Sequence, residues 1–472
     1  MLLPLRFISL AAVLMFSASA CAATPEPTPP SEYLQWLDNL KKEMVSRGIS
    51  QKTVEEVYKT DYYKPNTQVV KIDRKQAEFV LTSTDYLNRV VNKKRVEAAR
   101  RHYKKLLPHL RKIEEKYGVQ PHYIVAFWAV ETNFGQNFGG YDVIDALTTL
   151  SYDQRRPKFF KEELYQALKI IDTWHIDHTK MQGSWAGAMG QFQFMPSTFN
   201  AYAVDFNGDN TIDIWHSFDD AAASAANYLS KIGWDKKHEW GMEVSLPWNF
   251  NFADSGRNKI KTVKEWKKLG VQTVNKKKLN LPDDLQAAVI VPEGKKGNAY
   301  LVLNNFRKIM VWNRSENYAL AIGTLADYIR TGKIWKAAAE NPAVRLRTDD
   351  ILKIQAFINR WGWSKVDEDG MLGTQTREAI KQVQQKAKLP QDGYPDARLL
   401  EKINGYNPEI GFAVPVPGGI GAFHFIISLA LAGLYDIPME MGIIYATLSH
   451  TSQAITQIAF GAGSYIYEAL KK

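Results

Sequence analysis

The stretch FWAVETNFG, residues 127–135, contains one carboxylate, Glu131, among eight uncharged residues. Pro121 favours the start of a helix and Gly135 favours its end, so the sequence predicts a helix between them. On that helix, Glu131 shares a face with the aromatic residues three and four positions before it. An apolar face raises the pKa of a carboxyl, which suits a group that donates a proton near neutral pH. The alternative is a glutamate paired with an arginine or exposed where the helix ends.

A second stretch, QGSWAGAMGQFQFMPSTF at residues 182–199, is rich in small residues. It contains three uncharged hydrogen-bonding side chains and two glycines that allow a ligand or a neighbouring backbone to approach closely. These residues are Ser184, Gln191, Gln193, Gly187 and Gly190. Such a stretch can line a sugar groove, although runs of Gly, Ala and Ser also permit tight helix packing.

The composition is that of a globular protein that carries a net positive charge. The 472 residues are 45% hydrophobic and 12% aromatic, which is sufficient for two or three domains with sizeable cores. The formal net charge is +10, and the densest basic runs lie at residues 93–95, 100–101 and 276–278. We see no basic helix with base-reading spacing, so we expect a general attraction to polyanions and no nucleic-acid partner.

Hydrophobic periodicity predicts a mainly α (α+β) protein. The pattern is helical from Tyr33 to about Ile113, and residues 104–135, 159–178 and 219–232 are further helix candidates. Residues 285–313 differ, because AAVIVP, AYLVLNNF and KIMVWN are short β-like runs separated by Gly and Asn.

A linker at residues 334–347 precedes a compact unit at residues 348–404. Three helices are predicted in this unit, at Asp349–Asn359, Thr374–Ala387 and Ala397–Ile403. The segments VDEDGMLGTQT and LPQDGYPDA resemble each other as glycine turns that lead into the last two helices.

The N-terminus predicts export. Residues 1–20 combine Arg6, an apolar run and small residues, which is typical of a signal peptide too short to span a membrane. The sequence ASAC ending at Cys21, the only cysteine, resembles a bacterial lipobox, in which the cysteine is lipidated. Ordinary cleavage is the alternative, because Ala18 stands where lipoboxes usually have leucine. Residues 21–32 contain a Pro-rich tether.

Five motifs occur in a characteristic order: AVETNFG, GSWAGAMGQFQFMPSTF, DFNGDNTIDIW, ANYLSKIGW and VWNRS. Together they resemble the membrane-bound lytic murein transglycosylase B family, over residues 33–333. Residues 348–404 resemble the small three-helix peptidoglycan-binding domain often appended to such enzymes. The resemblance implies a lysozyme-like helical catalytic domain with a small β element.

The family cleaves the β-1,4 bond between N-acetylmuramic acid and N-acetylglucosamine in peptidoglycan glycan strands, and it leaves a 1,6-anhydro ring. The resemblance implies that Glu131 first protonates the glycosidic oxygen and then accepts the proton of the muramic 6-hydroxyl. One acid then suffices where ordinary glycosidases use two, and no cofactor is required for the chemistry. The positions carried over as substrate-binding are Ser184, Gln193, Trp312, Asn313 and Tyr318. Trp312 stands where the family often has tyrosine. A hydrolytic lysozyme-like muramidase and a non-catalytic wall-binding scaffold remain as alternatives.

Residues 205–213, DFNGDNTID, resemble the start of a calcium-binding EF-hand loop. The expected oxygen ligands of a structural Ca²⁺ are Asp205, Asn207, Asp209, the carbonyl of Thr211 and, as in the longer family loop, Asp219. The sixth position is Asn210 in place of glycine, and the twelfth is His216 in place of glutamate. The alternative is an Asp/Asn-rich turn that binds nothing tightly.

The C-terminal residues 405–472 form an apolar tail, with no charged residue at 411–435 or at 441–467. We expect residues 420–467 to associate with a membrane; a packing segment or an unrelated fusion is the alternative. The expected location is periplasmic and membrane-anchored. A lipidated Cys21 without a following Asp favours the outer membrane, whereas a spanning tail favours the inner membrane.

Overall fold

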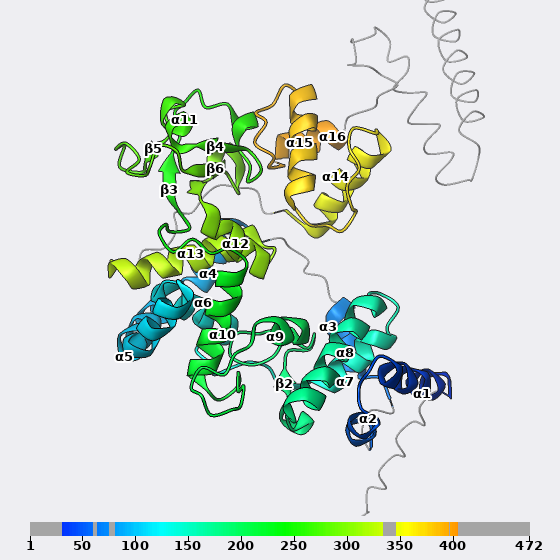
Figure 1. Ribbon diagram of the computed structural model, residues 1–472. Helices are drawn as coiled ribbons and strands as arrows, with labels where there is room; N and C mark the ends of the chain where they lie inside the picture. The colour runs from blue at the N-terminus through cyan, green and yellow to red at the C-terminus, as the bar shows by residue number, and fades with distance from the viewer. Residues whose placement is uncertain (1–30, 60–63, 75–80, 334–345, 396, 405–472) are drawn as a thin grey trace, which may run out of the picture. The chain divides into compact units, whose positions relative to one another are not determined.

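The computed structural model describes residues 31–59, 64–74, 81–333, 346–395 and 397–404 (Figure 1). The chain divides into two compact units, residues 1–394 and 395–472. The only helix described in the second unit is α16 (Ala397–Asn404). The predicted signal peptide, most of the predicted linker, and the tail, together with Cys21, lie outside the described residues.

The first unit is mainly helical. Its helices are α1 (Ser31–Ser46), α2 (Gln51–Val57), α3 (Thr67–Arg74), α4 (Ser83–Val90), α5 (Lys93–Tyr117), α6 (Pro121–Thr132), α7 (Val143–Tyr152), α8 (Pro157–Trp174), α9 (Pro196–Tyr202), α10 (Phe218–Lys231), α11 (Val263–Lys268), α12 (Asn304–Trp312), α13 (Glu316–Thr331), α14 (Thr348–Arg360) and α15 (Thr374–Lys386). Its strands are β1 (Tyr141–Asp142), β2 (Gln182–Gly183), β3 (Gly241–Ser245), β4 (Ile260–Thr262), β5 (Gln272–Thr273), β6 (Gln286–Ile290) and β7 (Ala299–Val302). None of the described helices is long and apolar enough to cross a membrane.

Helix α6 runs through the hydrophobic core of the helical part. It begins at Pro121 as predicted, and every residue from there to Ala129 is buried, because the segment is apolar on all sides. Helices α5, α10 and α13 pack against it. The predicted helix at 104–135 is in fact two helices, because Gly118 adopts a left-handed φ of 73° and ends α5.

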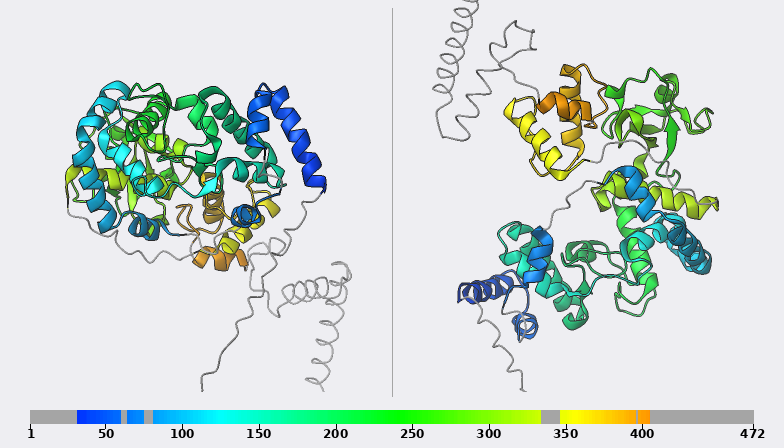
Figure 2. Two further views of the ribbon diagram at one scale, coloured as in Figure 1. Left: turned by 90° about the horizontal axis from the view of Figure 1, so that it is seen from below. Right: turned by 180° about the vertical axis from the view of Figure 1, so that it is seen from behind.

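Helices α1 and α2 pack beside α7 and α8, as both views of Figure 2 show. An ion pair of 2.9 Å joins Lys161 of α8 to Glu43 of α1. The Tyr165 hydroxyl of α8 also donates to the carbonyl of Arg47, at 3.0 Å. This group of helices continues the core that surrounds α6.

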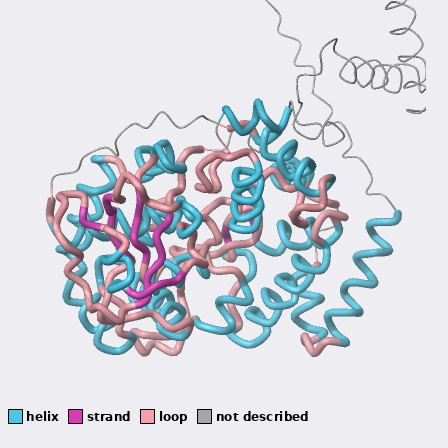
Figure 3. Tube along the Cα trace, turned by 90° about the horizontal axis from the view of Figure 1, so that it is seen from above, coloured by secondary structure: helices cyan, strands magenta, loops and turns pink. Residues whose placement is uncertain are grey.

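The strands β3 to β7 form one antiparallel sheet in the order β4-β6-β7-β3-β5, which we call the β module together with α11 (Figure 3). The module has a core of its own, built around Val263, Trp266, Val289 and Leu301. The sequence predicted the β6 and β7 runs but missed β3, β4 and β5, which are only two to five residues long.

The prediction of a β-like run at KIMVWN was wrong, because residues 308–312 belong to α12. Phe306, Ile309 and Met310 are buried at three- and four-residue spacing, while Val311, directly after Met310, is 54% exposed. That spacing is the helical period, whereas the preceding run AYLV, which is buried at all four positions, is a strand.

The predicted wall-binding helices are confirmed as α14, α15 and α16, with bounds within two residues of those expected. The two similar glycine turns are held in the same way in the first unit. The Gln355 side-chain oxygen accepts from the Gly370 amide at 2.9 Å, and the Gln384 oxygen accepts from the Gly393 amide at 2.8 Å. Both glutamines are buried. The two turns therefore form an internal repeat, in which a buried glutamine satisfies the backbone amide of the glycine.

Candidate active site

Glu131 lies in the last turn of α6, half-buried, as the sequence predicted. Its Oε1 atom accepts hydrogen bonds from the indole Nε1 of Trp312, at 2.9 Å, and from the hydroxyl of Tyr318. Among the described residues, Oε2 has no hydrogen-bond donor and Glu131 forms no ion pair. The alternative of an arginine-paired glutamate is therefore wrong for the described chain, and one carboxyl oxygen is left to carry a proton.

Burial raises the pKa of Glu131 to about 7. The hydrogen bonds from Tyr318 and Trp312 act in the opposite direction, because both stabilise the ionised form. No charged side chain in the described part of the chain contributes to the shift. The carboxyl is therefore poised between its two protonation states near neutral pH, as a group that must first give and then take a proton requires.

Trp312 and Tyr318 come from different elements, the end of α12 and the first turns of α13. The Trp312 ring stacks on Tyr228 at 5.1 Å and lies 4.6 Å from the ring of Phe127. From the sequence, Trp312 was expected only as a substrate-binding residue at a position where the family often has tyrosine. The structure shows that the indole N–H of Trp312 is itself a donor to Glu131.

Tyr86 of α4 is a neighbour of this carboxyl that the sequence analysis missed. Burial, followed by the negative charge of Glu131, raises the pKa of Tyr86. The same charge helps to raise the pKa of Tyr318, after burial. No local signal marks Tyr86, because it lies on a separate short helix 45 positions earlier in the chain.

The remaining predicted sugar contacts hold backbone turns and form no described hydrogen bond to Glu131. The Ser184 hydroxyl accepts from the amides of residues 186 and 188, at 3.3 and 3.1 Å. The Gln193 amide donates to the carbonyl of Phe138 at 3.0 Å, and Asn313 is exposed.

The small-residue stretch packs against the core at its two glycines. A side chain at Gly187 would come within 2.6 Å of Leu147, and one at Gly190 within 2.7 Å of the backbone oxygen of Ile214. Gln191, predicted as a groove residue, is buried and accepts from the Trp128 indole at 2.9 Å. At Gly187, Gly190 and Gln191 the stretch therefore packs against protein, and these three positions do not face a ligand.

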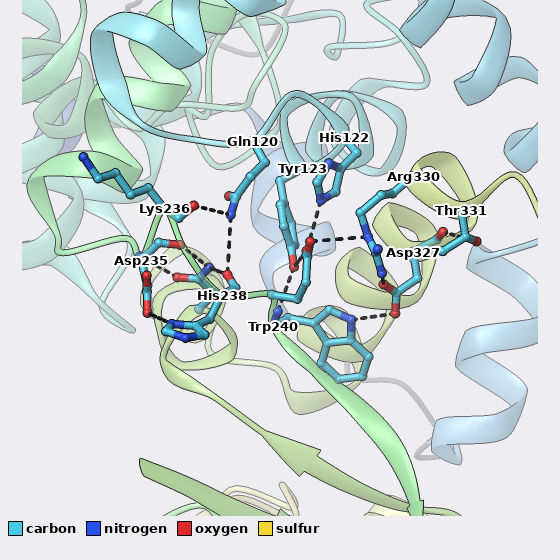
Figure 4. Close-up of polar contacts among 12 residues, drawn as sticks. Gln120, His122, Tyr123, Asp235, Lys236, His238, Trp240, Asp327, Arg330 and Thr331 are labelled. Carbon is cyan, nitrogen blue, oxygen red and sulfur yellow. Dashed lines mark hydrogen bonds and ion pairs between the residues drawn. The ribbon is translucent and has the colours of Figure 1, made fainter. Parts of the chain in front are cut away.

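The opposite end of α6 holds a polar network that the sequence did not suggest (Figure 4). The Glu239 carboxylate accepts from the Tyr123 hydroxyl at 2.8 Å, contacts His122 Nε2 at 3.1 Å and pairs with Arg330 at 3.3 Å. Trp240 and Arg330 in turn both donate to Asp327, at 3.0 Å each. Glu239 thereby joins the start of α6 to the end of α13, the two helices whose other ends bring Glu131 and Tyr318 together.

The predicted calcium loop is organised by a carboxylate that the sequence analysis did not select. Asp220 is fully buried and accepts from the amides of residues 206, 207 and 213, at 2.9 to 3.3 Å. Asp219 points elsewhere and pairs with His109 at 3.0 Å. The loop oxygens suit calcium chemically. The described residues, however, gather no group of three His, Cys, Asp or Glu side chains that could hold a metal.

Comparisons with known proteins agree with this geometry. The family described as "Transglycosylase SLT domain" matches residues 32–327, and a peptidoglycan binding domain family matches residues 347–403. A curated relative, membrane-bound lytic murein transglycosylase B of Escherichia coli K12, is 35% identical over 220 residues. That match covers 46% of this chain and 59% of the relative, so the chain spans less than two thirds of that protein's length.

Solved structures extend the match. SltB3 from Pseudomonas aeruginosa, in complex with NAG-NAM-pentapeptide, is 38% identical with a TM-score of 0.74, over 79% of this chain and 99% of that one. The Escherichia coli lytic transglycosylase Slt35 in complex with calcium is 27% identical with a TM-score of 0.54, over 63% of this chain and 94% of that one. These matches confirm the expected mainly helical, lysozyme-like fold with a small β element. Because the family match spans well over half of the sequence, this chain belongs to the SLT transglycosylase family.

Proposed function

We propose that this protein is a lytic transglycosylase that cleaves the β-1,4 bond between N-acetylmuramic acid and N-acetylglucosamine in peptidoglycan. The observation that carries the proposal is the state of Glu131, a carboxyl with a pKa of about 7 whose Oε1 is held by two donors. Family membership and the wall-binding match at 347–403 support the substrate class. The solved neighbour bound to NAG-NAM-pentapeptide supports it as well.

Glu131 acts first as the acid. Its proton, carried on Oε2, passes to the glycosidic oxygen while the bond from that oxygen to the anomeric carbon of the muramic residue breaks. The leaving sugar departs with a free hydroxyl, and positive charge develops on the anomeric carbon. Glu131 is then a carboxylate, and the donors Trp312 and Tyr318 stabilise its negative charge.

Glu131 acts second as the base. The carboxylate accepts the proton of the muramic 6-hydroxyl, whose oxygen bonds to the anomeric carbon and closes the 1,6-anhydro ring. The proton balance returns to its starting state and no water is consumed. The substrate's own N-acetyl group is the proposed stabiliser of the intermediate positive charge, which is consistent with the absence of a second carboxylate among the groups that shift the pKa of Glu131.

The decisive experiment is mass spectrometry of the fragments released from purified peptidoglycan. We expect anhydro-muropeptides from the wild-type protein. Glu131→Gln should lower turnover by about 10²–10⁴-fold, because it removes the titrating group and keeps the size of the side chain. Glu162→Gln is the matched control, since Glu162 lies on the surface and pairs with Arg47.

Each other outcome rejects the proposal in a different way. Reducing ends in place of anhydro ends would identify a hydrolytic muramidase. Binding to sacculi without any release would identify a scaffold. Near wild-type release of anhydro products by Glu131→Gln would show that the single-acid mechanism is wrong. Ser184→Ala and Asn313→Ala should have milder effects than Glu131→Gln, because we propose that they remove sugar contacts and leave the proton carrier in place.

We further propose a structural calcium site in the loop that starts at Asp205, with Asn207, Asp209, Thr211 and Asp219 as the other ligands. The left-handed φ of 67° at Asn210 supports this, because the sixth position of an EF-hand loop needs that conformation. Asp219 would have to leave His109 to close such a site.

Calcium should then affect the stability of the wild-type protein more than its intrinsic catalytic rate. It should raise the melting temperature, because binding to the folded state alone stabilises that state. Asp209→Ala should abolish the rise. A melting temperature that stays constant across the calcium titration in both proteins would remove the proposal.

We propose that the protein is exported and acts on the wall from a membrane-anchored position, through a lipidated Cys21 and the apolar segment 420–467. The support is the sequence pattern of these segments. Cys21→Ser should reduce incorporation of radiolabelled fatty acid in growing cells to background, and unchanged labelling would contradict lipidation.

A further inference from the structure

Helix α5 carries a large net positive charge. Its 25 residues include ten Lys and Arg and three Glu, a net charge of +7, compared with +10 for the whole sequence. In the sequence, the basic residues at 93–95 and 100–101 are two separate runs. The structure places both on one helix, together with the further basic residues at 104–105 and 111–112.

Six exposed side chains of α5 form what we call the basic stripe. Its members are Lys93, Lys94, Arg101, Lys104, Lys105 and Lys112. At about 100° per residue they fall within an arc of about 120°, and the stripe is about 28 Å long. None of the six forms an ion pair with a described carboxylate, and two exposed glutamates, Glu97 and Glu115, lie within the same arc.

The other side of α5 is committed to the core, where Val96, Ala99, Leu110 and Ile113 are buried. None of the described large hydrophobic side chains that are exposed lies on this helix. A helix that inserts into a bilayer surface presents apolar residues to the lipid. The basic stripe therefore suits a partner that it attracts by charge, and it lacks the apolar groups for insertion into a membrane.

Helix α5, which carries the basic stripe, is a direct neighbour of α6, the helix that carries Glu131 (Figure 1). His102, next to Arg101, stacks on Phe134 at 4.5 Å and meets the edge of Trp128 at 5.1 Å. These two aromatic residues stand three positions on either side of Glu131. Burial, followed by the charges of Arg101 and Lys105, lowers the pKa of His102. The electrostatic potential of the basic stripe therefore extends to the histidine that contacts these two aromatic rings.

We propose that the basic stripe of α5 binds the carboxylates of peptidoglycan stem peptides and so brings a glycan strand to the Glu131 site. This inference rests on the proposed function. An extended row of cations suits a polymer with repeating anionic groups better than it suits a compact ligand. Such a surface increases the local concentration of substrate and the rate of encounter, and both effects weaken as salt is added.

The test compares two full-length variants with equal loss of charge. The stripe variant carries Arg101→Gln, Lys104→Gln, Lys105→Gln and Lys112→Gln. The control carries Lys264→Gln, Lys268→Gln, Lys277→Gln and Lys278→Gln, which are exposed lysines of the β module. On sacculi at low salt, we expect the stripe variant to lose about tenfold in kcat/KM, mainly through KM, and the control to change less than twofold.

A second substrate identifies the anion. An amidase frees glycan strands of stem peptides but exposes a lactyl carboxyl on each muramic residue, so these carboxyls are then capped as neutral methylamides. On the capped strands, the wild-type protein and the stripe variant should have the same kcat/KM. A tenfold loss that persists on these strands would overturn the role of the stem carboxylates. An equal loss of kcat/KM in the stripe and control variants on sacculi would show that only the net charge of the protein matters. That result would overturn the proposal.

Two further measurements separate the remaining outcomes. Cosedimentation with sacculi in a Glu131→Gln background tests the basic stripe without any chemistry, so it remains informative if the proposed activity fails. Unchanged cosedimentation on adding the four stripe substitutions would overturn the proposal. Loss of binding to vesicles of anionic phospholipid, with binding to sacculi unchanged, would assign the stripe to the membrane surface and also overturn it.

Discussion

Glu131 receives both of its described hydrogen bonds at Oε1, and this asymmetry decides how it can titrate. Burial disfavours the ionised form, while Trp312 and Tyr318 favour it, and the balance leaves the pKa at about 7. A carboxyl without these donors would hold its proton too tightly to act as a base. A carboxyl without burial would be ionised at neutral pH and would be a poor acid.

At this scale we predict the effect of Tyr318→Phe. Loss of the hydroxyl removes a bond to the ionised form, so the pKa of Glu131 should rise above its present value. In the proposed mechanism the first step needs protonated Glu131, so activity should be lost as the pH rises through that pKa. The alkaline limb of the pH profile of kcat/KM should therefore move to higher pH, with turnover at neutral pH lower by roughly tenfold.

Tyr165→Phe is the matched control, because its hydroxyl donates to the carbonyl of Arg47 at the distant α1–α8 contact. Its pH profile should match that of the wild-type protein. An alkaline limb that stays in place in Tyr318→Phe would show that the Tyr318 hydroxyl does not tune Glu131.

At the scale of elements, α6 and α13 are joined at both ends. Glu131 and Tyr318 meet at one end, and Glu239 ties His122 and Tyr123 to Arg330 at the other (Figure 4). Burial tends to raise the pKa of Glu239, but bonds from His122 and Tyr123 and the nearby positive charges outweigh it, so the pKa is lowered overall.

We predict that Glu239→Ala lowers the free energy of unfolding at neutral pH by about 1–3 kcal/mol, because buried His122 and Tyr123 lose their partner. A lowered folded-state pKa means that the contribution is present at neutral pH and is lost as the pH falls through that pKa. The difference in the free energy of unfolding between Glu239→Ala and the wild-type protein should therefore become smaller at acidic pH.

Urea denaturation at several pH values measures both effects. Glu162→Ala, which removes an exposed ion pair with Arg47, should cost less than about 1 kcal/mol. If the two variants were equally stable at neutral pH, the Glu239 network would not hold the two helices together.

At the scale of the whole molecule, we predict that a chain ending at Asn404 is soluble, active and able to bind sacculi. The last described helix ends there. The solved SltB3 chain is matched over 99% of its length by 79% of this chain, so a chain of this family folds without a further segment of this size. Circular dichroism, sacculus cosedimentation and product analysis would check the three properties. Failure of the shortened chain to fold would show that residues 405–472 belong to the core.

The local sequence was sufficient to predict those features whose residues all lie within one short segment. The apolar run around Glu131, opened by Pro121, predicts a buried helix with an isolated acid. The paired glycine turns at Gly370 and Gly393 mark the repeat in the wall-binding domain. In these cases, periodicity and turn chemistry act within about fifteen residues, and tertiary packing only confirms them.

Tertiary structure decided everything that joins distant segments. The partners of Glu131 lie 181 and 187 positions away, and nothing in FWAVETNFG indicates that Trp312 and Tyr318 donate to one of its oxygens. The misread run KIMVWN became helix because burial on one side followed the helical period. The basic stripe became visible only once separate runs lay on one helix face. The physical reason is common to all three: contacts, burial and field depend on which side chains the fold brings together, whereas sequence order records only which residues are neighbours along the chain.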